Sequence, residues 1–374
     1  MSDKTPKRDL GFTYIYPDLD ASEQRKKDQL LRESVRPLFP SKTESVADLV
    51  HAMAGMSIQA RNIGQCYQVM QQIYADEDRP TVLLGLAGPL VAGGLRQVIR
   101  EFIANGLVDV VVSTGAILYQ DLYQARGYQH FRGTPDADDC ELRSLLIDRI
   151  YDTYVDEKGF GETDTWVGLI ADQMEPGAVS SRQFMDVLAD EIDDPNSMVK
   201  TCREAGIPMF VPALNDSSIG IGLTEHHHRC IKTGKAGIKI DSIQDNYELT
   251  QIVAASKATA AIYVAGGVPK NYINDSIVMS YIFDRKDQGH RYAIQMTTAV
   301  TQDGGLSGST LDEAKSWGKV KVDASRAMAW VEPTVALPLL VTAALQDGLG
   351  KRRTRLVLSW NGELLDKIAH VERS

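Results

Sequence analysis

The chain has 374 residues, 43% of them hydrophobic, so it can build a large core and is not disordered over most of its length. Its formal net charge of −10 argues against a nucleic-acid-binding surface and favours cationic ligands or partners. The start carries no apolar run and no later segment reaches about eighteen uninterrupted apolar residues, so we expect no signal peptide, no membrane span and a cytoplasmic protein.

Residues 1–42 are polar and contain a Tyr14-Ile-Tyr-Pro17 patch and a charged run from Glu23 to Arg32. We predict an N-terminal arm with one helix there, a candidate for packing on another subunit. A helix is expected from Thr43, and a second one continues to about Tyr74. No repeat or linker interrupts the rest of the chain, so residues 43–374 are predicted to form a single domain.

A β-α-β unit follows. Residues 81–86 and 108–112 are short apolar runs typical of buried strands, and residues 90–105 have helical periodicity. Parallel strands joined by a helix place their carboxyl ends at one edge, where α/β proteins bind ligands. The glycines after the first strand suit a dinucleotide phosphate cradle, although there is no Gly-x-Gly-x-x-Gly. A tight turn with close helix packing explains them equally well: Gly85, Gly88, Gly93 and Gly94.

The remaining chain continues this alternation. We predict mainly helix over residues 118–196 and a charged surface connection over residues 283–290. A helix is expected to follow the Gly266–Asn271 run and to end at about Met279, and another is expected over residues 337–345. Strands are expected at residues 207–211, 259–264, 292–298 and 328–331, and one more ends near Asp241. The fold class is therefore α/β, with a mostly parallel sheet, helices on both faces and a small N-terminal extension.

The most unusual stretch is residues 303–319. Small residues (Gly304, Gly305, Ser307, Gly308, Ser309) precede a carboxylate at Glu313, an indole at Trp317 and an amine at Lys319. Ser309 or Thr310 can cap a helix that begins near Leu311 and ends before Lys319. Such a helix would place Glu313 and Trp317 on one face. For an arbitrary sequence this would be a capped helix followed by a solvated lysine.

The run from Glu313 to Lys319, Glu-Ala-Lys-Ser-Trp-Gly-Lys, resembles the active-site segment of deoxyhypusine synthase. The segment Gln59-Ala-Arg-Asn-Ile-Gly64 is similar to an element near the start of the same family, and the resemblance extends from about Gly55 to Leu345. It implies a Rossmann-like fold, a homotetramer, bound NAD and transfer of an aminobutyl group from spermidine to a lysine of a translation factor.

The resemblance also implies residue roles. Lys319 would form an imine with the substrate, Trp317 would cover the site and face a cationic amine, and Glu313 would anchor an ammonium or move protons. A nucleophilic lysine must be neutral, so desolvation or a neighbouring cation would have to favour loss of its proton. The residues expected to bind NAD are Gly88, Pro89, Leu90, Val91, Ala92, Thr114, Gly115, Ala116, Asp216, Gly266, Thr298, Ala299 and Glu332.

Other positions depart from the family pattern. Tyr119 and Gln120 replace two adjacent glutamates, Ile221 replaces an acid, Asn271 a histidine and Leu306 an aspartate. One charged hydrogen bond contributes about 1.5–3 kcal/mol, so losing several would weaken the same spermidine pose strongly. The expected substrate-binding residues are Tyr119, Gln120, Asn271, Gly304, Ser307, Glu313 and Trp317.

These departures leave several functions open. The covalent chemistry is expected to persist with a changed amine or acceptor, the acceptor being a protein lysine or a small diamine such as putrescine, which would give homospermidine. The alternative is a catalytically idle NAD- or polyamine-binding protein descended from such an enzyme. NAD-consuming deacylation as in sirtuins is disfavoured, because zinc-binding cysteine pairs are missing.

Two further groups of residues invite a function. His226, His227 and His228 lie near Cys230, but three consecutive histidines cannot converge on one point, so no metal site is predicted. Asp303 is either a proton relay or a structural turn residue. The four widely spaced cysteines suit buried free thiols in a reducing compartment.

Overall fold

The computed structural model describes residues 17–372 apart from 286–288. The chain divides into two compact units, Met1–Pro37 and Leu38–Ser374. In the described part of the first unit, helix α1 (Ala21–Leu30) begins at Asp20, whose carboxylate accepts the Ser22 and Glu23 N–H groups in a capping box. The helix expected in the charged run is therefore present. Most of the Tyr14–Pro17 patch and the middle of the 283–290 connection lie outside the described residues.

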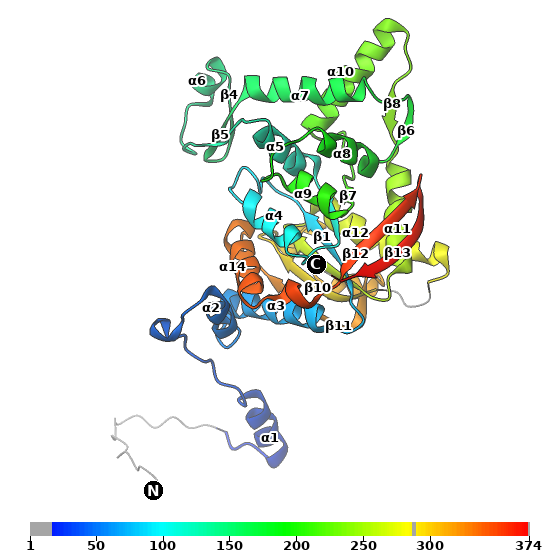
Figure 1. The fold of residues 1–374 in the computed structure, drawn as a ribbon. Coiled ribbons are helices and arrows are strands. Elements are labelled where there is room, and N and C mark those ends of the chain that lie inside the picture. Colours follow the sequence, from blue (N-terminus) through cyan, green and yellow to red (C-terminus); the bar gives the residue numbers. More distant parts are fainter. Residues whose placement is uncertain (1–16, 286–288, 373–374) are drawn as a thin grey trace. The chain divides into compact units, whose positions relative to one another are not determined.

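The second unit is built on a six-stranded parallel sheet with the strand order β11-β10-β9-β1-β2-β7 (Figure 1). This confirms the predicted α/β class. Its strands are β1 (Thr81–Leu86), β2 (Val110–Ser113), β7 (Met209–Phe210), β9 (Thr259–Val264), β10 (His290–Met296) and β11 (Val320–Ala329).

The sheet is buried on both faces because its strands are apolar at successive positions. Val82, Leu84 and Leu86 belong to one core cluster, whereas Leu83 belongs to the cluster on the opposite face. The helices are α2 (Val46–Met53), α3 (Ile58–Ala75), α4 (Arg96–Ala104), α5 (Gly115–Ala125), α6 (Asp139–Ser144), α7 (Glu157–Ala171), α8 (Ser181–Asp190), α9 (Met198–Ala205), α10 (Ser218–Thr233), α11 (Ser242–Ala255), α12 (Gly267–Met279), α13 (Glu313–Ser316) and α14 (Pro333–Gln346).

Helices α3 and α14 contact the sheet on the first face, and α12 contacts β1, β2 and β9 on the other, where α11 packs against α12. Single 3₁₀ turns occur at η1 (Pro40–Lys42), η2 (Ser280–Phe283), η3 (Thr301–Asp303) and η4 (Leu349–Arg352). Among the described residues, no helix combines the length and the apolar character needed to cross a bilayer.

Several elements differ from the sequence prediction. The segment expected to be mainly helical, 118–196, also contains the antiparallel sheet β3-β5-β4: β3 (Phe131–Arg132), β4 (Ile147–Ile150) and β5 (Thr153–Asp156). The strand that ends near Asp241, β8 (Ile238–Ile240), pairs with β6 (Gly177–Val179) instead of joining the central sheet. The expected helix over residues 90–105 begins only at Arg96, because Gly94 with φ +88 forms a turn before it.

The chain ends in an antiparallel hairpin, β12 (Arg355–Asn361) and β13 (Leu364–Val371), which lies beside α11 (Figure 1). The backbone of its turn contacts α11 and α8. The Gln251 side chain donates to Glu363 O and accepts from the Leu365 N–H, and the Arg182 guanidinium stacks over the Trp360 ring at 4.2 Å. The hairpin therefore fixes helices α8 and α11 to each other.

Candidate active site

The glycine-rich loop between β10 and α13 is anchored by a buried lysine. Lys270 on α12 has no exposed surface, and its Nζ donates to Leu306 O at 3.0 Å, Ser309 O at 2.6 Å and Ser309 Oγ at 3.0 Å. Burial lowers the pKa of Lys270 to about 8. Its oxygen partners compensate part of the cost of burying the amine, so this lysine fixes the loop to α12.

Small residues let the loop approach the sheet closely. A Cβ on Gly266 would lie 2.7 Å from Ser307 Cα, and one on Gly308 would lie 2.1 Å from Val300 O. Gln295 at the end of β10 donates to Ser307 O at 2.9 Å, and the Gly267 N–H donates to Ser307 Oγ at 2.9 Å. A larger residue at Gly266 would push the loop away from the end of β9, and one at Gly308 would push it away from the segment that follows β10.

Lys319 lies where the sequence placed it, directly after a short helix. Helix α13 is a single turn that begins at Glu313, whose N–H is capped by Thr310 Oγ1 at 2.9 Å. Gly318, with φ +69, ends it. The helix is shorter than expected, and Trp317 lies at its C-cap instead of within it.

The Lys319 amine is held by two side chains of α12. Its Nζ lies 3.0 Å from Asp275 Oδ1 and 3.1 Å from Asn271 Oδ1, and 5.4 Å from the centre of the Trp317 ring. The Lys319 side chain is only 14% exposed. The lysine is thus withdrawn from bulk solvent as an ion pair, while most of the Trp317 surface remains exposed.

A cavity of about 640 Å³ opens next to this ion pair. It extends from the ends of β9 and β10 to the lysine partners on α12. Its lining residues are Asn246, Gly267, Val268, Asn271, Tyr272, Asp275, Ala299, Val300, Asp303, Gly305, Leu306, Ser307 and Gly308. The structure therefore brings together Asn271, Ser307 and Ala299 from the predicted site, with Asp303 beside them.

Two residues of this cavity escaped the sequence analysis. Asp275 pairs with Lys319, and Tyr272 is only 9% exposed with a hydroxyl that has no partner among the described residues. Desolvation raises the pKa of Tyr272, so its hydroxyl stays protonated. The signal for Asp275 was present, because a residue four positions after Asn271 on a helix shares its face.

The predicted dinucleotide residues gather at the carboxyl edge of the sheet. Gly88–Ala92 follow β1, Thr114–Ala116 follow β2, Gly266 follows β9, and Thr298 and Ala299 follow β10. Gly88 has φ +87, and a Cβ on Gly115 would lie 2.2 Å from Ser217 Oγ. Gly88 is exposed, whereas Gly115 and Gly266 are buried. Backbone N–H groups at adjacent strand ends are the groups that hold a dinucleotide diphosphate in α/β folds.

The two predicted acids at this edge differ in their contacts. Asp216 is exposed, and its carboxylate has no partner among the described residues, so it is available to hold ribose hydroxyls. Glu332 is the N-cap of α14 and accepts the Thr334 N–H at 2.7 Å. A cap of this kind stabilises the helix by itself, so Glu332 has a structural role whether or not it contacts a ligand.

Tyr119 and Gln120, which were predicted to contact the substrate, do not line the cavity beside Lys319. The Tyr119 hydroxyl is buried and donates to Phe160 O at 2.7 Å. Gln120 Oε1 accepts the Ala92 N–H at 3.0 Å, so this residue supports the turn after β1. Both side chains fill positions inside the helical layer of α5, where a free charge would be costly. Ile221 is exposed on α10.

The histidine run contains one buried member. Asp172 Oδ1 lies 2.6 Å from His226 Nδ1, and the Ile238 N–H donates to His226 Nε2 at 3.2 Å. Cys230 Sγ completes a group whose ligand atoms lie within 4.8 Å of one another. Both ring nitrogens already have protein partners, so a metal would have to displace them. His227 and His228 are exposed, and the four cysteines are free.

The deoxyhypusine synthase family model matches residues 48–344. The chain belongs to the deoxyhypusine synthase family. This membership implies a transferase.

Relatives of this family support the assignment along most of the chain. A "Deoxyhypusine synthase-like protein" from Chlorobaculum parvum is 41% identical over 83% of this chain and 89% of its own length. A "Probable deoxyhypusine synthase 2" from Methanosarcina mazei is 39% identical over 88% of this chain and 95% of its own. The fold matches the crystal structure of a proposed deoxyhypusine synthase from Entamoeba histolytica with a TM-score of 0.58, 17% identity and coverage of 83% and 97%.

Proposed function

We propose that this protein is an NAD-dependent alkylamine transferase that moves an aminobutyl group from a polyamine such as spermidine through an imine on Lys319. The observation that carries the proposal is the position of Lys319. Its amine is largely buried, paired with Asp275, and lies beside a cavity that reaches the carboxyl edge of the sheet.

The cavity has the chemistry of a polyamine site. Asp275 and Asp303 supply negative charge, and Asn271 and Tyr272 supply neutral polar groups. Val268, Val300 and Leu306 offer apolar surface for the methylene segments between nitrogens. The ring of Trp317 beside Lys319 can receive a substrate ammonium in place of the lysine. Glu313 is exposed next to it and suits a distal ammonium.

Lys319 has to lose its proton before it can attack. The ion pair with Asp275 holds the ammonium, so entry of a cationic amine that competes for the carboxylate would separate the pair. The neutral Nζ then adds to the imine carbon of the substrate. The bond from that carbon to the departing diamine breaks as the diamine nitrogen takes a proton. An acceptor amine next adds to the carbon and displaces Lys319.

The glycine turns at the ends of β1, β2 and β9 would hold NAD, with Asp216 on a ribose. The chemistry that NAD supplies when bound is reversible hydride exchange with the carbon next to the amine nitrogen, without net consumption. The chain's part is to fix the geometry. Gln295 and Lys270 hold the loop from Leu306 to Ser309, and Gln120 supports the turn after β1.

The experiment is an amine-product assay with enzyme, NAD and spermidine. We expect release of 1,3-diaminopropane, together with a borohydride-reduced adduct on the peptide that contains Lys319. Lys319→Ala should abolish both. Lys315→Ala is the matched control on the same turn, because its amine pairs only with Asp312 among the described residues. Absence of diaminopropane with every polyamine tested would refute the proposal.

The acceptor is tested in the same assay by adding putrescine. Homospermidine among the products selects a small diamine acceptor, and its absence together with labelling of a protein lysine selects a protein acceptor. We also propose a homotetramer. Val268, Val300 and Trp317 are exposed at and beside the cavity, an apolar rim that a neighbouring subunit would cover. Light scattering of the purified protein measures the assembly.

One observation favours a second candidate function. Asp275 and Asn271 hold the Lys319 amine, and Tyr119 and Gln120 make contacts inside the fold. A catalytically idle NAD- or polyamine-binding protein would have these features. Binding of NAD and spermidine without any adduct on Lys319 after borohydride treatment would support this candidate and reject the first.

A further inference from the structure

A second cavity lies at the N-terminal part of α11, and it shares no lining residue with the cavity beside Lys319. It has a volume of about 390 Å³ and is formed by α10, β8, the start of α11 and the turn after β7. Its walls are mainly apolar, with Val211, Leu214, Leu223 and Ile238 among the lining residues. None of the residues assigned to the amine or dinucleotide sites lines it.

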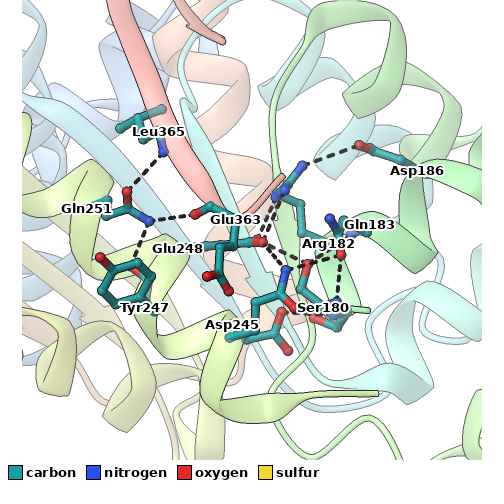
Figure 2. Close-up of polar contacts among 12 residues, drawn as sticks. Ser180, Arg182, Gln183, Asp186, Asp245, Tyr247, Glu248, Gln251, Glu363 and Leu365 are labelled. Atoms are coloured by element: carbon teal, nitrogen blue, oxygen red, sulfur yellow. Dashed lines mark hydrogen bonds and ion pairs between the residues drawn. The ribbon is translucent and has the colours of Figure 1, made fainter. Parts of the chain in front are cut away.

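One buried carboxylate reaches this cavity. Asp245 is 1% exposed; its Oδ1 accepts the Ser181 N–H at 2.8 Å, whereas its Oδ2 has no partner among the described residues. Figure 2 shows Asp245 at the edge of a polar cluster, with one oxygen directed away from its neighbours. A buried carboxylate oxygen without a partner is costly, so its position beside a cavity points to a ligand.

The surrounding charges leave Asp245 uncompensated. Arg182 supplies the guanidinium of the cluster, and it binds Glu248, with Nε 2.6 Å from Oε2 (Figure 2). Glu248 also accepts from Ser180 and Gln244. Desolvation and the Glu248 charge raise the pKa of Asp245 to about 7. A cation placed in the cavity would therefore relieve both the desolvation and the repulsion.

The polar residues at the mouth define the kind of ligand. Asn215, Thr224, His227, Lys239 and Ser242 line the cavity and are exposed. A metal ion would find one carboxylate and apolar walls, which are too few oxygen ligands for Mg²⁺ or Ca²⁺. A ligand anion would meet the acidic cluster of Asp245 and Glu248. A short alkyl chain with one ammonium matches both the walls and the carboxylate.

We propose that this cavity is a binding site for a short aliphatic primary amine, whose ammonium pairs with Asp245 and whose methylene chain packs on Val211, Leu214, Leu223 and Ile238. The site is separate from the cavity beside Lys319, and the proposal does not depend on catalysis. Ala213, in the turn at the edge of this cavity, has φ +56, a strained conformation of the kind that collects at ligand sites.

The test is calorimetric titration of the full chain with n-butylamine, using 1-butanol and butyrate as neutral and anionic controls. We expect a butylamine-binding component that Asp245→Asn weakens at least tenfold, the loss expected for one charged hydrogen bond. Asp186→Asn is the matched control, because Asp186 lies near Arg182 but does not line this cavity.

A second variant guards against misfolding of the first. Thr224→Trp blocks the cavity mouth from an exposed helix position and should remove the same component, whereas Ile231→Trp, an exposed position on the same helix that does not line the cavity, should leave it unchanged. Circular dichroism confirms that all variants fold. Equal butylamine binding by wild type, Asp245→Asn and Thr224→Trp would overturn the proposal, as would equally tight binding of 1-butanol.

The pH dependence gives an independent readout. Butylamine stays charged between about pH 6 and 8, whereas Asp245 takes up a proton as the pH falls through about 7. Affinity should therefore fall on acidification in wild type and change less in Asp245→Asn. The other titratable groups near Asp245 and the cavity are Glu248 on the same helix, Arg182 on α8, His227 on α10, Lys239 on β8 and Tyr272 on α12. Repeating the titration in His227→Gln tests whether the imidazole at the cavity mouth contributes to this pH dependence.

Discussion

Lys270 offers a test of the energetics that hold the glycine-rich loop. Its amine is fully buried and donates to Leu306 O, Ser309 O and Ser309 Oγ. Substitution by Met keeps a similar length and removes the titrating group. We expect Lys270→Met to fold and to leave the two loop carbonyls without their donor. The free energy of unfolding should fall by about 1–3 kcal/mol for each buried acceptor left unsatisfied.

The pH dependence of the free energy of unfolding isolates the contribution of the Lys270 charge. Burial lowers the pKa of Lys270 from its ordinary value of 10.5 to about 8. Between these values the unfolded chain binds the proton that the folded chain has released, so the free energy of unfolding rises with pH. At about 1.4 kcal/mol for each pH unit, wild type should gain roughly 3 kcal/mol relative to Lys270→Met between pH 8 and 10.5.

The measurement is urea unfolding of both proteins at several pH values in this range, at one protein concentration, followed by circular dichroism. The difference between the two free energies cancels the titration of other groups. Lys232→Met, at an exposed lysine in the last turn of α10, is the control and should give no trend. A wild-type-minus-variant difference that stays flat from pH 8 to 10.5 would refute the reasoning.

Three more outcomes follow from particular contacts. Gly308→Ala should lower the free energy of unfolding by about 1–3 kcal/mol, because its Cβ would lie 2.1 Å from Val300 O. Gly305→Ala is the control and should change that free energy little, because a Cβ there would have nothing within 4 Å. Equal effects of the two substitutions would contradict the close approach at Gly308. Burial lowers the pKa of His290 to about 3, so the folded protein resists protonation there. In urea unfolding, wild type should therefore lose stability relative to His290→Gln as the pH falls below 6.5. The control, His228→Gln at an exposed histidine, should show no such difference from wild type. Tyr272→Phe should change the free energy of unfolding by no more than about 0.5 kcal/mol, since its hydroxyl has no partner among the described residues. It should weaken polyamine binding about two- to tenfold in calorimetry. A clear loss of stability with unchanged binding would show that the hydroxyl has a structural role instead.

The central strands of the sheet could be predicted from the sequence. Thr81–Leu86 and Thr259–Val264 are short apolar runs bounded by turn residues, and they form β1 and β9 with the expected limits. Local patterning is sufficient there because both faces of these strands are buried. The short strands β3, β4 and β5 were missed, since they form a small separate sheet of mostly exposed or half-buried residues and lack such runs.

The sequence by itself identified the family and singled out Lys319, because the segment that carries it is continuous and its glycines and cap act locally. Only the tertiary structure decided what surrounds that amine. Asp275 and Asn271 reach it from a helix more than forty residues earlier, and Tyr119 and Gln120 turn into the helical layer instead. The cavity around Asp245 likewise joins α10, β8 and α11. Contacts between distant segments depend on how helices pack on the sheet, and no local pattern in the chain encodes that packing.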